Sequence, residues 1–259
     1  MASQVQPSLP ANPWIVGRVA DADPRLRVIC LPPAGAGSGA FAGWRAHRPE
    51  GVELLPVELP GRGTRVAEAL PASVDELADA LFDGIVEEFR QPYVLFGHSF
   101  GGMLGYELAR RVERRGGPLP VATVVAAARA PHIAPAELIT DGDDKALLRW
   151  LLANDGIPRE LFRFPEFVRQ VLKDVRADLL LAESYVLAEP VPVATPLHVL
   201  GAAGDGVVAE ADLRAWSACA GGRYSLTMLP GGHGFPQADP AAVLAALGHL
   251  LPVDLSVDR

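Results

Sequence analysis

The residue types needed for nucleophilic acyl transfer, a serine, a histidine and a carboxylate, each follow a predicted strand in this sequence. Ser99 lies in GHSFG, residues 97–101, between the apolar run Tyr93–Phe96 and a helical pattern. A serine on such a strand-to-helix turn exposes its hydroxyl to a base, and the flanking glycines leave room where side chains would crowd the turn. Because small residues also make ordinary tight turns, the serine needs a base and an acid elsewhere in the chain.

His233 is the candidate base. It stands in LPGGHGFP, directly after the last predicted strand, so its loop is expected at the same sheet edge as Ser99. His98 is adjacent to Ser99, but successive side chains of an extended segment point in opposite directions. The other histidines have no comparable setting; they are His47, His132, His198 and His249. A histidine in a glycine-rich loop is by itself only a loop residue, so the assignment depends on the serine motif.

Asp205 is the candidate acid that orients the histidine. It lies in AAGDG, after the predicted strand Leu197–Gly201, where an aspartate is also a common turn residue. The loop after the earlier strand Val121–Ala127 contains no carboxylate. The order Ser99, Asp205, His233 is the order found in α/β-hydrolases. The three residues therefore predict a Ser-His-Asp triad.

Acyl transfer also needs backbone donors for the oxyanion. One candidate is the N–H of Phe100, directly after the serine, and a second is expected in the loop after an early strand. In the loop CLPPAGAG, residues 30–37, the prolines carry no N–H, so Ala34 is the first donor after the strand. A plain glycine-rich turn fits the same residues. A nucleotide-binding loop does not, because the acidic ligand expected about 20 residues later is matched only loosely by Glu53 or Glu58.

The elements that must position these residues are short apolar runs separated by helical patterns. The runs are too continuous for a sheet with one wet face, and they predict strands of a buried parallel sheet. These runs are Arg27–Leu31, Glu53–Glu58, Tyr93–Phe96, Val121–Ala127, Leu197–Gly201 and Tyr224–Leu229. The helical patterns are Ser73–Arg90, Phe100–Arg115, Ala209–Cys219 and Pro240–Leu251. This alternation predicts an α/β fold with a mostly parallel central sheet and helices on both faces.

The alternation is interrupted between Pro131 and Pro190, where only helical patterns at Asp143–Asn154 and Pro165–Val186 are found. Such an insert, at about residues 132–190, is expected to form a lid over the carboxyl edge of the sheet, where ligands bind in this fold class. Its apolar residues recur at helical spacing and are expected to gate an acyl pocket; they are Leu147, Leu148, Leu151, Leu152, Leu172, Val175 and Leu179. The candidate substrate-binding residues are Pro33, Gly35, Met103, Leu172, Val175 and Leu179.

Composition narrows the class of protein. The 259 residues are 49% hydrophobic and carry a formal net charge of −8, which argues against nucleic acid or an anionic membrane as the main partner. Two cysteines make neither a disulfide framework nor a metal site, and no metal or other cofactor is expected. The sequence has no signal peptide pattern and no span of about 18 apolar residues, so a soluble, cytoplasmic protein is expected. Residues 1–13 are expected to be a flexible tail, and residues 14–259 a single domain.

With these residues placed, the chain resembles the type II thioesterases that accompany polyketide synthases and nonribosomal peptide synthetases. The resemblance extends from about Arg27 to Leu251, and besides the triad it includes LPPAGAG, LPGRG, GYELARR, ARAPH and RADLLLAESY. It implies an α/β-hydrolase fold with a helical lid. It also implies hydrolysis of acyl groups from the phosphopantetheine arm of acyl or peptidyl carrier proteins, without metal or redox cofactor. A general esterase, a stand-alone cyclising thioesterase and a non-catalytic hydrolase-like binding protein are the alternatives.

A basic stripe on the lid is the candidate docking site for an acidic carrier protein. Arg169, Lys173 and Arg176 fall at i, i+4 and i+7 of the predicted helix Pro165–Val186, hence on one face. Local basic residues are needed because the net charge of the chain offers no long-range attraction to an acidic partner. An ordinary solvated helix face, paired with nearby acidic residues, is the alternative.

Overall fold

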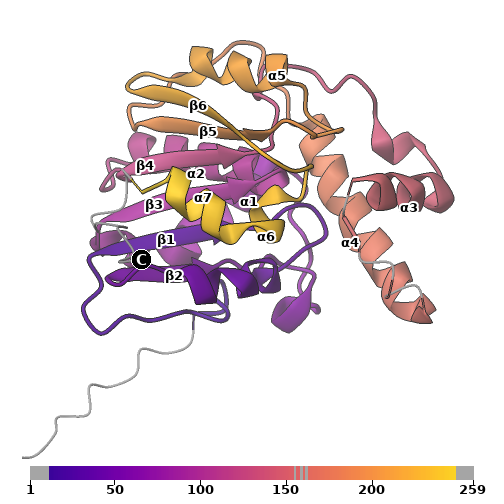
Figure 1. The fold of residues 1–259 in the computed structure, drawn as a ribbon, viewed down its shortest axis with the longest axis horizontal. Coiled ribbons are helices and arrows are strands. Elements are labelled where there is room, and N and C mark those ends of the chain that lie inside the picture. Colours follow the sequence, from indigo (N-terminus) through magenta and orange to yellow (C-terminus); the bar gives the residue numbers. More distant parts are fainter. Residues whose placement is uncertain (1–11, 155, 158–159, 161–162, 249–259) are drawn as a thin grey trace, which may run out of the picture.

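A parallel sheet runs through the middle of the molecule (Figure 1). The computed structural model describes residues 12–248 apart from 155, 158–159 and 161–162. Within these residues the sheet has six strands in the order β2-β1-β3-β4-β5-β6, and all neighbouring pairs are parallel. The strands are β1 (Leu26–Leu31), β2 (Val52–Pro56), β3 (Tyr93–His98), β4 (Ala122–Ala126), β5 (Leu197–Ala202) and β6 (Tyr224–Leu229). The predicted fold class is confirmed.

The predicted strands agree with the observed ones to within two residues at each end. The change that matters for the site is in β3, which continues through Gly97 and His98. Gly97 pairs with Leu31 of β1, and His98 pairs with Ala126 of β4. Ser99 therefore lies directly beyond the carboxyl end of a central strand.

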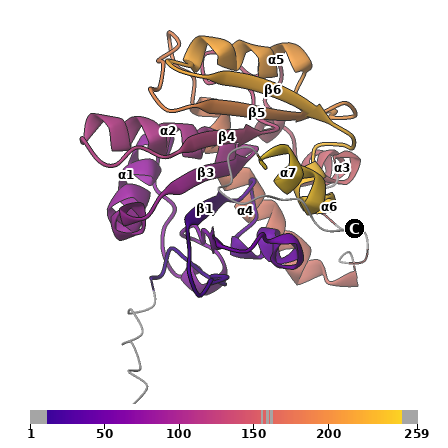
Figure 2. The same ribbon diagram turned by 60° about the vertical axis from the view of Figure 1, so that its left-hand side comes forward.

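Helices cover both faces of this sheet (Figure 2). One face packs against α1 (Val74–Ile85), α2 (Phe100–Arg114) and α5 (Glu210–Arg214). The other face packs against the 3-10 helix η1 (Ser38–His47) and the helices α6 (Phe235–Ala238) and α7 (Pro240–Ala246). Successive strand residues alternate between the two apolar layers: Leu95 joins the first layer, while Val94 and Phe96 join the second. Burial on both sides explains the continuous apolar runs of the sequence.

Local signals set the helix ends. The hydroxyl of Ser73 accepts a hydrogen bond from the N–H of Glu76 and caps α1, as its type predicts. Several predicted helices are shorter than expected because their last turns tighten into 3-10 geometry. Helix α1 is followed by Val86–Arg90, and α5 by Ala215–Cys219, both as 3-10 helices. Helix α7 ends at Ala246. The predicted helix continued to Leu251, but residues from His249 onward lie outside the described residues.

The N-terminal tail predicted for residues 1–13 lies mostly outside the described residues, and its boundary stays a prediction. The side-chain amide of Asn12 donates a hydrogen bond to the carbonyl of Gly84, and Trp14 is buried beside it. Ile15 then forms an antiparallel bridge with Val57, after the edge strand β2. Asn12 and Trp14 are thus packed against the rest of the domain.

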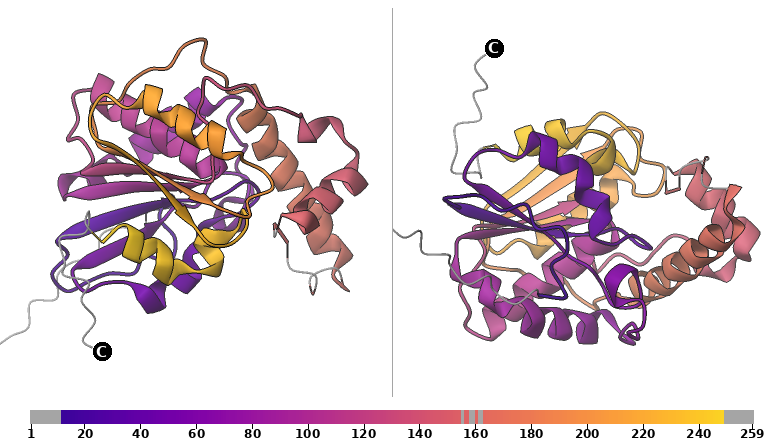
Figure 3. Two further views of the ribbon diagram at one scale, coloured as in Figure 1. Left: turned by 45° about the horizontal axis from the view of Figure 1, so that its top comes forward. Right: turned by 90° about the horizontal axis from the view of Figure 1, so that it is seen from below.

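The lid stands apart from the sheet at one end of it (Figures 1 and 3). Its helical elements are η4 (Ile139–Asp141), α3 (Asp144–Ala153) and α4 (Pro165–Ser184). Helices α3 and α4 share an apolar cluster of their own, formed by Leu147, Leu151, Ile157, Val168, Leu172 and Val175. The side chain of Asp143 caps α3, and Pro165 occupies the first turn of α4, where a missing N–H costs nothing. The predicted helical insert is present in the described part of the chain.

Candidate active site

The turn after β3 holds Ser99 in a backbone conformation that few residues adopt, with φ 55° and ψ −118°. The neighbouring glycines are required by close backbone contacts. A Cβ on Gly97 would lie 2.0 Å from the carbonyl oxygen of Gly101, and a Cβ on Gly101 would lie 2.2 Å from that of Leu31. The crowding predicted for this turn is thus confirmed, and it presents the serine at the start of α2.

Ser99, His233 and Asp205 form a continuous hydrogen-bonded series. His233 Nε2 lies 3.1 Å from Ser99 Oγ, and His233 Nδ1 lies 3.0 and 3.1 Å from the two carboxylate oxygens of Asp205. With Nδ1–H donating to Asp205, Nε2 is free to accept the serine proton. The structure therefore brings together the three residues that the sequence predicted.

Backbone donors hold Asp205 in its charged form. Its Oδ1 accepts hydrogen bonds from the N–H groups of Val207, at 2.7 Å, and Val208, at 3.1 Å. Burial alone would raise the pKa of Asp205, but the bond to His233, the imidazole charge and the two N–H groups outweigh it and hold the pKa below its ordinary value. The carboxylate of Asp205 is therefore ionised at neutral pH, where it can accept the hydrogen bond from His233 Nδ1–H.

His98 positions the loop that carries His233. It is buried, and its Nε2 lies 2.9 Å from the carbonyl oxygen of His233, to which it donates as Nε2–H. Burial, assisted by the nearby His233 ring, lowers the pKa of His98 to about 3. His98 is thus neutral at physiological pH and does not compete as the base. This agrees with the sequence analysis, which excluded His98 as the candidate base.

The loop after β1, which carries Ala34, runs against the start of α2, which carries Phe100. The close approach of Gly101 to the carbonyl groups of Leu31 and Pro32 records this contact. Pro33 to Ala36 form a turn, closed by the Ala36 N–H donating to the Pro33 carbonyl at 3.1 Å. Ala34 is the second residue of this turn, and both Ala34 and Phe100 line cavities that also contact Ser99.

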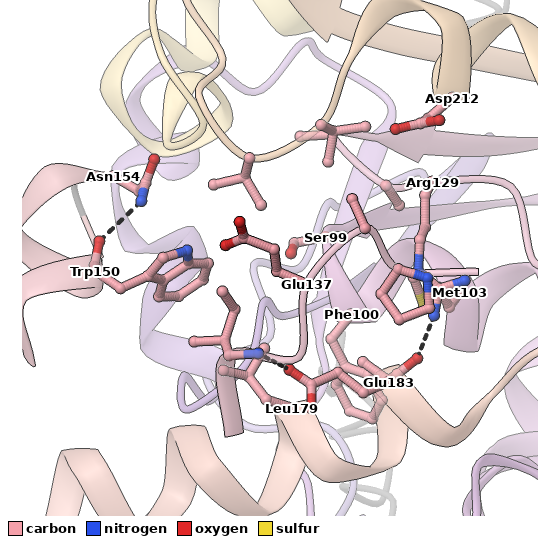
Figure 4. Close-up of a pocket in the computed structure, with 18 of the residues that line it drawn as sticks. Ser99, Phe100, Met103, Arg129, Glu137, Trp150, Asn154, Leu179, Glu183 and Asp212 are labelled. Atoms are coloured by element: carbon pink, nitrogen blue, oxygen red, sulfur yellow. Dashed lines mark hydrogen bonds between the residues drawn. The ribbon is translucent and has the colours of Figure 1, made fainter. Parts of the chain in front are cut away.

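A first cavity of about 480 Å³ meets Ser99 from the side of α2 and the start of the lid (Figure 4). Met103 of α2 and Leu179 of α4 contribute apolar surface, and Arg129, Glu137 and Glu183 contribute charge. The Glu183 carboxylate accepts hydrogen bonds from the N–H groups of Ile139 and Thr140, so it braces the lid. This cavity has a mixed polar and apolar wall.

A second cavity of about 580 Å³ meets Ser99 and His233 from the opposite side, between the loop after β1 and the lid. Its wall is mostly apolar and includes Trp150, Leu151, Phe167, Val171 and Phe235. Trp150, Asn154 and Leu179 line both cavities, so the lid separates them above the serine. Among the described residues, two cavities thus meet at the candidate nucleophile.

Five of the six predicted substrate-binding residues line these cavities. Met103 lines the first, Pro33, Gly35 and Val175 line the second, and Leu179 lines both. Leu172 is the exception, because it is buried in the apolar cluster between α3 and α4. Leu172 lines neither of the two cavities and packs inside the lid, so its contact with substrate stays a prediction.

The predicted docking stripe is only partly available. Lys173 is exposed, and Arg169 is exposed but paired with Glu166. Arg176 is engaged within the lid: it donates to the carbonyls of Thr140 and Gly142, at 2.7 and 2.9 Å, and pairs with Asp144 at 3.0 Å. The stripe prediction is corrected for Arg176, whose long side chain reaches η4 and α3 instead of solvent.

Arg62 and Asp178 were not assigned any role from the sequence, yet they form a buried ion pair beside the turn that carries Ala34. A signal was present. Asp178 interrupts the apolar stripe of α4, three residues after Val175 and four before Ala182, and a lone carboxylate at such a position requires a buried cation. The sequence did not identify which of 21 arginines supplies it.

Within the described ranges, no helix is both long enough and apolar enough to cross a bilayer. The same residues contain no group of three or more histidine, cysteine, aspartate or glutamate side chains that could hold a metal ion.

Comparison with known proteins gives a consistent result. The family model described as "Thioesterase domain" matches residues 26–251. AmbE, an AMB antimetabolite synthetase of Pseudomonas aeruginosa, is 36% identical over 92% of the chain, which spans 11% of the AmbE length. The solved structure of BorB, a type II thioesterase from the borrelidin biosynthetic cluster, is 32% identical with a TM-score of 0.82, over 93% of this chain and 99% of BorB. RedJ, a thioesterase from the prodiginine pathway of Streptomyces coelicolor, is 32% identical with a TM-score of 0.81, over 90% of each chain.

Proposed function

The chain belongs to the thioesterase domain family, and we propose that it hydrolyses acyl thioesters held on the phosphopantetheine arm of carrier proteins. In this role it is an editing type II thioesterase of a polyketide or nonribosomal peptide pathway, which removes stalled or wrong acyl units. The observation that carries the proposal is the hydrogen-bonded series Ser99–His233–Asp205 at the meeting point of two cavities. A thioester has two arms, one on each side of its reacting carbonyl, and two cavities at the nucleophile accommodate both.

The geometry supports a two-step mechanism. His233 takes the proton of the Ser99 hydroxyl as the serine oxygen attacks the thioester carbonyl. The resulting oxyanion accepts hydrogen bonds from the N–H groups of Ala34 and Phe100. The tetrahedral species then collapses, and the C–S bond breaks as His233 gives its proton to the departing thiol sulfur. Asp205 stabilises the imidazolium in between.

The second step releases the acid. A water molecule takes the place of the thiol, gives a proton to His233 and attacks the Ser99 acyl ester. Collapse of the second tetrahedral species returns the proton to the Ser99 oxygen and frees the carboxylic acid. No group outside the triad and the two backbone donors is required to balance either step.

The cavities support a division of the substrate. The cavity beside Val175 and Phe235 is mostly apolar and suits a hydrocarbon chain, which gains by leaving water. The cavity beside Arg129 and Glu137 offers polar groups that suit the amides and hydroxyl of a phosphopantetheine arm. Replacing Val171, which lines the same cavity, by Trp should therefore shift the preferred acyl chain toward shorter substrates.

The test is a panel of acyl-carrier proteins with different acyl chains, assayed for release of the free acid. We expect faster hydrolysis of the carrier-bound thioester than of a simple ester with the same acyl group. A protein that prefers the simple ester is a general esterase, and one that releases a ring is a cyclising thioesterase. Labelling of Ser99 by a fluorophosphonate separates all of these from a non-catalytic binding protein, which would not react.

A further inference from the structure

The turn that carries Ala34 is held from outside by two charged side chains. The N–H of Gly35 donates to Asp178 Oδ2 at 2.7 Å, and Arg62 donates from Nη1 to the carbonyl of Ala36 at 3.1 Å. Gly35 has a φ of +75° at the third position of the turn, where a type II turn requires a positive value. Both of these bonds come from residues distant in sequence.

Arg62 and Asp178 are themselves a bidentate pair. Nη1 and Nη2 of Arg62 lie 2.5 and 2.6 Å from the two carboxylate oxygens of Asp178, and the side chains are 6% and 0% exposed. Burial alone would lower the pKa of Arg62, but the hydrogen bond to Asp178 together with the negative charges of Asp178, Asp174 and Glu58 outweighs burial and raises the pKa above its ordinary value. The pair is thus a fixed charged group that bridges α4 of the lid and the turn.

The lid helix also touches the turn directly. A Cβ on Gly35 would lie 2.1 Å from Cγ2 of Val175, which stands one helical turn before Asp178 on α4. Glycine is therefore required here both by its positive φ and by the approach of the lid. Contact and ion pair together tie the turn to α4.

We propose that Arg62 and Asp178 are positioning residues that orient the Ala34 N–H toward the oxyanion and make this donor depend on the seating of lid helix α4. The proposal rests on the function proposed above and assigns to it a part outside the triad. Neither side chain needs to contact the substrate. The pair acts through the backbone of Gly35 and Ala36, which flank the donor on its C-terminal side.

The decisive variant replaces both charges with apolar side chains of similar size, Arg62→Met with Asp178→Leu. Removing one partner alone leaves a buried unpaired charge and destabilises the fold, whereas removing both relieves that penalty. A purely structural pair would therefore regain activity in the double variant as stability returns. A positioning pair would not, because the turn remains without its anchors.

We expect the double variant to melt above either single variant but to lose about 10²-fold in kcat, as the loss of one oxyanion donor does. KM for a short acyl thioester should change little. A boronic acid with the same acyl group, whose adduct with Ser99 places an oxygen among the oxyanion donors, should bind about 10²-fold more weakly. Recovery of wild-type kcat together with stability would overturn the proposal.

Two controls keep the test sharp. Glu107→Gln breaks another buried ion pair, Arg111–Glu107, and should lower the melting temperature while leaving kcat unchanged. If the double variant does not fold, Asp178→Asn carries the test, since an amide oxygen still accepts from Gly35 but holds Arg62 poorly. It should lower kcat at unchanged KM, and an unchanged kcat in this variant contradicts the proposal.

The assay separates this inference from the proposed function. All variants are compared with wild type on a p-nitrophenyl ester as well as on an acyl-carrier protein. A wild type that acts on the ester but not on the carrier contradicts the carrier function, while the ratio of variant to wild type on the ester still tests the turn.

Discussion

The Arg62–Asp178 pair at the carboxyl edge of the sheet and the Arg111–Glu107 pair in the helical layer are both buried, yet their remaining hydrogen bonds go to different partners. The first pair binds the backbone of a turn beside Ser99. In the second pair, Arg111 and Glu107 are one helical turn apart on α2, and Arg111 also bonds side chains of the neighbouring helix α1.

The side chains around Arg111 show what the second pair is for. Arg111 also bonds Asp75 at 2.8 Å and Asp79 at 2.9 Å, both on α1; Asp75 is exposed and Asp79 is half-exposed. Glu107 also accepts from the hydroxyl of Tyr185, at the end of the lid helix. This cluster joins elements without touching the candidate site. Two buried ion pairs of similar chemistry therefore have different roles. The Arg62–Asp178 pair holds a turn beside Ser99, whereas the Arg111–Glu107 pair attaches neighbouring helices to α2. The difference lies in the groups to which each pair is hydrogen-bonded.

The largest expected effect falls on the candidate site alone. Ser99→Ala should remove turnover by about 10⁶-fold, and the double change with His233→Ala should be scarcely worse, because members of a triad act as one unit. Both variants should retain the wild-type melting temperature. Steady-state hydrolysis and thermal melting check this. Losses that multiply in the double variant would show that Ser99 and His233 act independently.

The next effect concerns Asp205. Asp205→Asn should lower kcat by about 10³–10⁴-fold, because an amide that accepts from the N–H groups of Val207 and Val208 cannot hold the His233 tautomer. The fold should be retained, since both backbone bonds can still be accepted by the amide oxygen. A loss below about tenfold would mean that another carboxylate supports His233.

A substitution in the Arg111–Glu107 pair should have the opposite effect: it should lower stability and leave kcat unchanged. Glu107→Gln should lower the free energy of unfolding by about 1–3 kcal/mol, because Arg111 loses its buried carboxylate partner but keeps Asp75 and Asp79. Chemical denaturation measures this value, and kcat on a small acyl ester measures the site. A large fall in kcat at temperatures where the variant is folded would erase the distinction between the two regions.

A smaller effect is expected in the pH dependence of stability. The folded-state pKa of His98 is about 3, against an ordinary value of 6.5. Between these values the unfolded chain binds the extra proton, so stability is complete above pH 6.5 and falls by about 1.4 kcal/mol per pH unit as the pH decreases. His98→Gln should flatten this part of the curve between pH 6.5 and 5. A slope identical to wild type would mean that His98 is protonated in the fold.

The smallest effect is expected at the surface of the lid. Reversal of Arg169 and Lys173 to Glu should lower kcat/KM for an acyl-carrier protein several-fold at low salt, and less at high salt. Hydrolysis of a small acyl thioester should not change. Arg176 is left out because it holds η4 and α3 in place. Equal effects on both substrates would remove these residues from carrier docking.

The sequence predicted the sheet and the grouping of Ser99, Asp205 and His233 because both depend on local signals. Strands buried on two sides are continuous apolar runs, and the loops at their carboxyl ends must meet at one edge. The grouping is observed, while the catalytic roles remain a prediction to be tested as described above.

The sequence could not predict how each side chain of the lid is directed. Leu172 and Leu179 share an apolar face, but only the packing of α3 decides that Leu172 turns into the lid and Leu179 toward the serine. Arg176 was expected on the surface because it shares a helix face with Arg169 and Lys173. Its partners at Thr140 and Gly142 lie in a segment without a periodic pattern, so the sequence did not indicate them. The pair Arg62–Asp178 joins residues 116 positions apart, and no local sequence pattern around either residue identifies its partner.

The contact between Gly35 and Val175 has a consequence for recombination between related enzymes. The lid invites exchange, since it is an insert with its own apolar cluster. A transplanted lid would nevertheless meet a turn that is packed against a different helix, and its carboxylate would have to reach Arg62 and the Gly35 N–H with unchanged geometry. The exchangeable module is therefore larger than the insert: it comprises the lid, the turn at 33–36 and the LPGRG segment at 59–63. Chimaeras cut at the borders of that module should inherit specificity and rate together, whereas chimaeras cut at the lid alone should inherit neither.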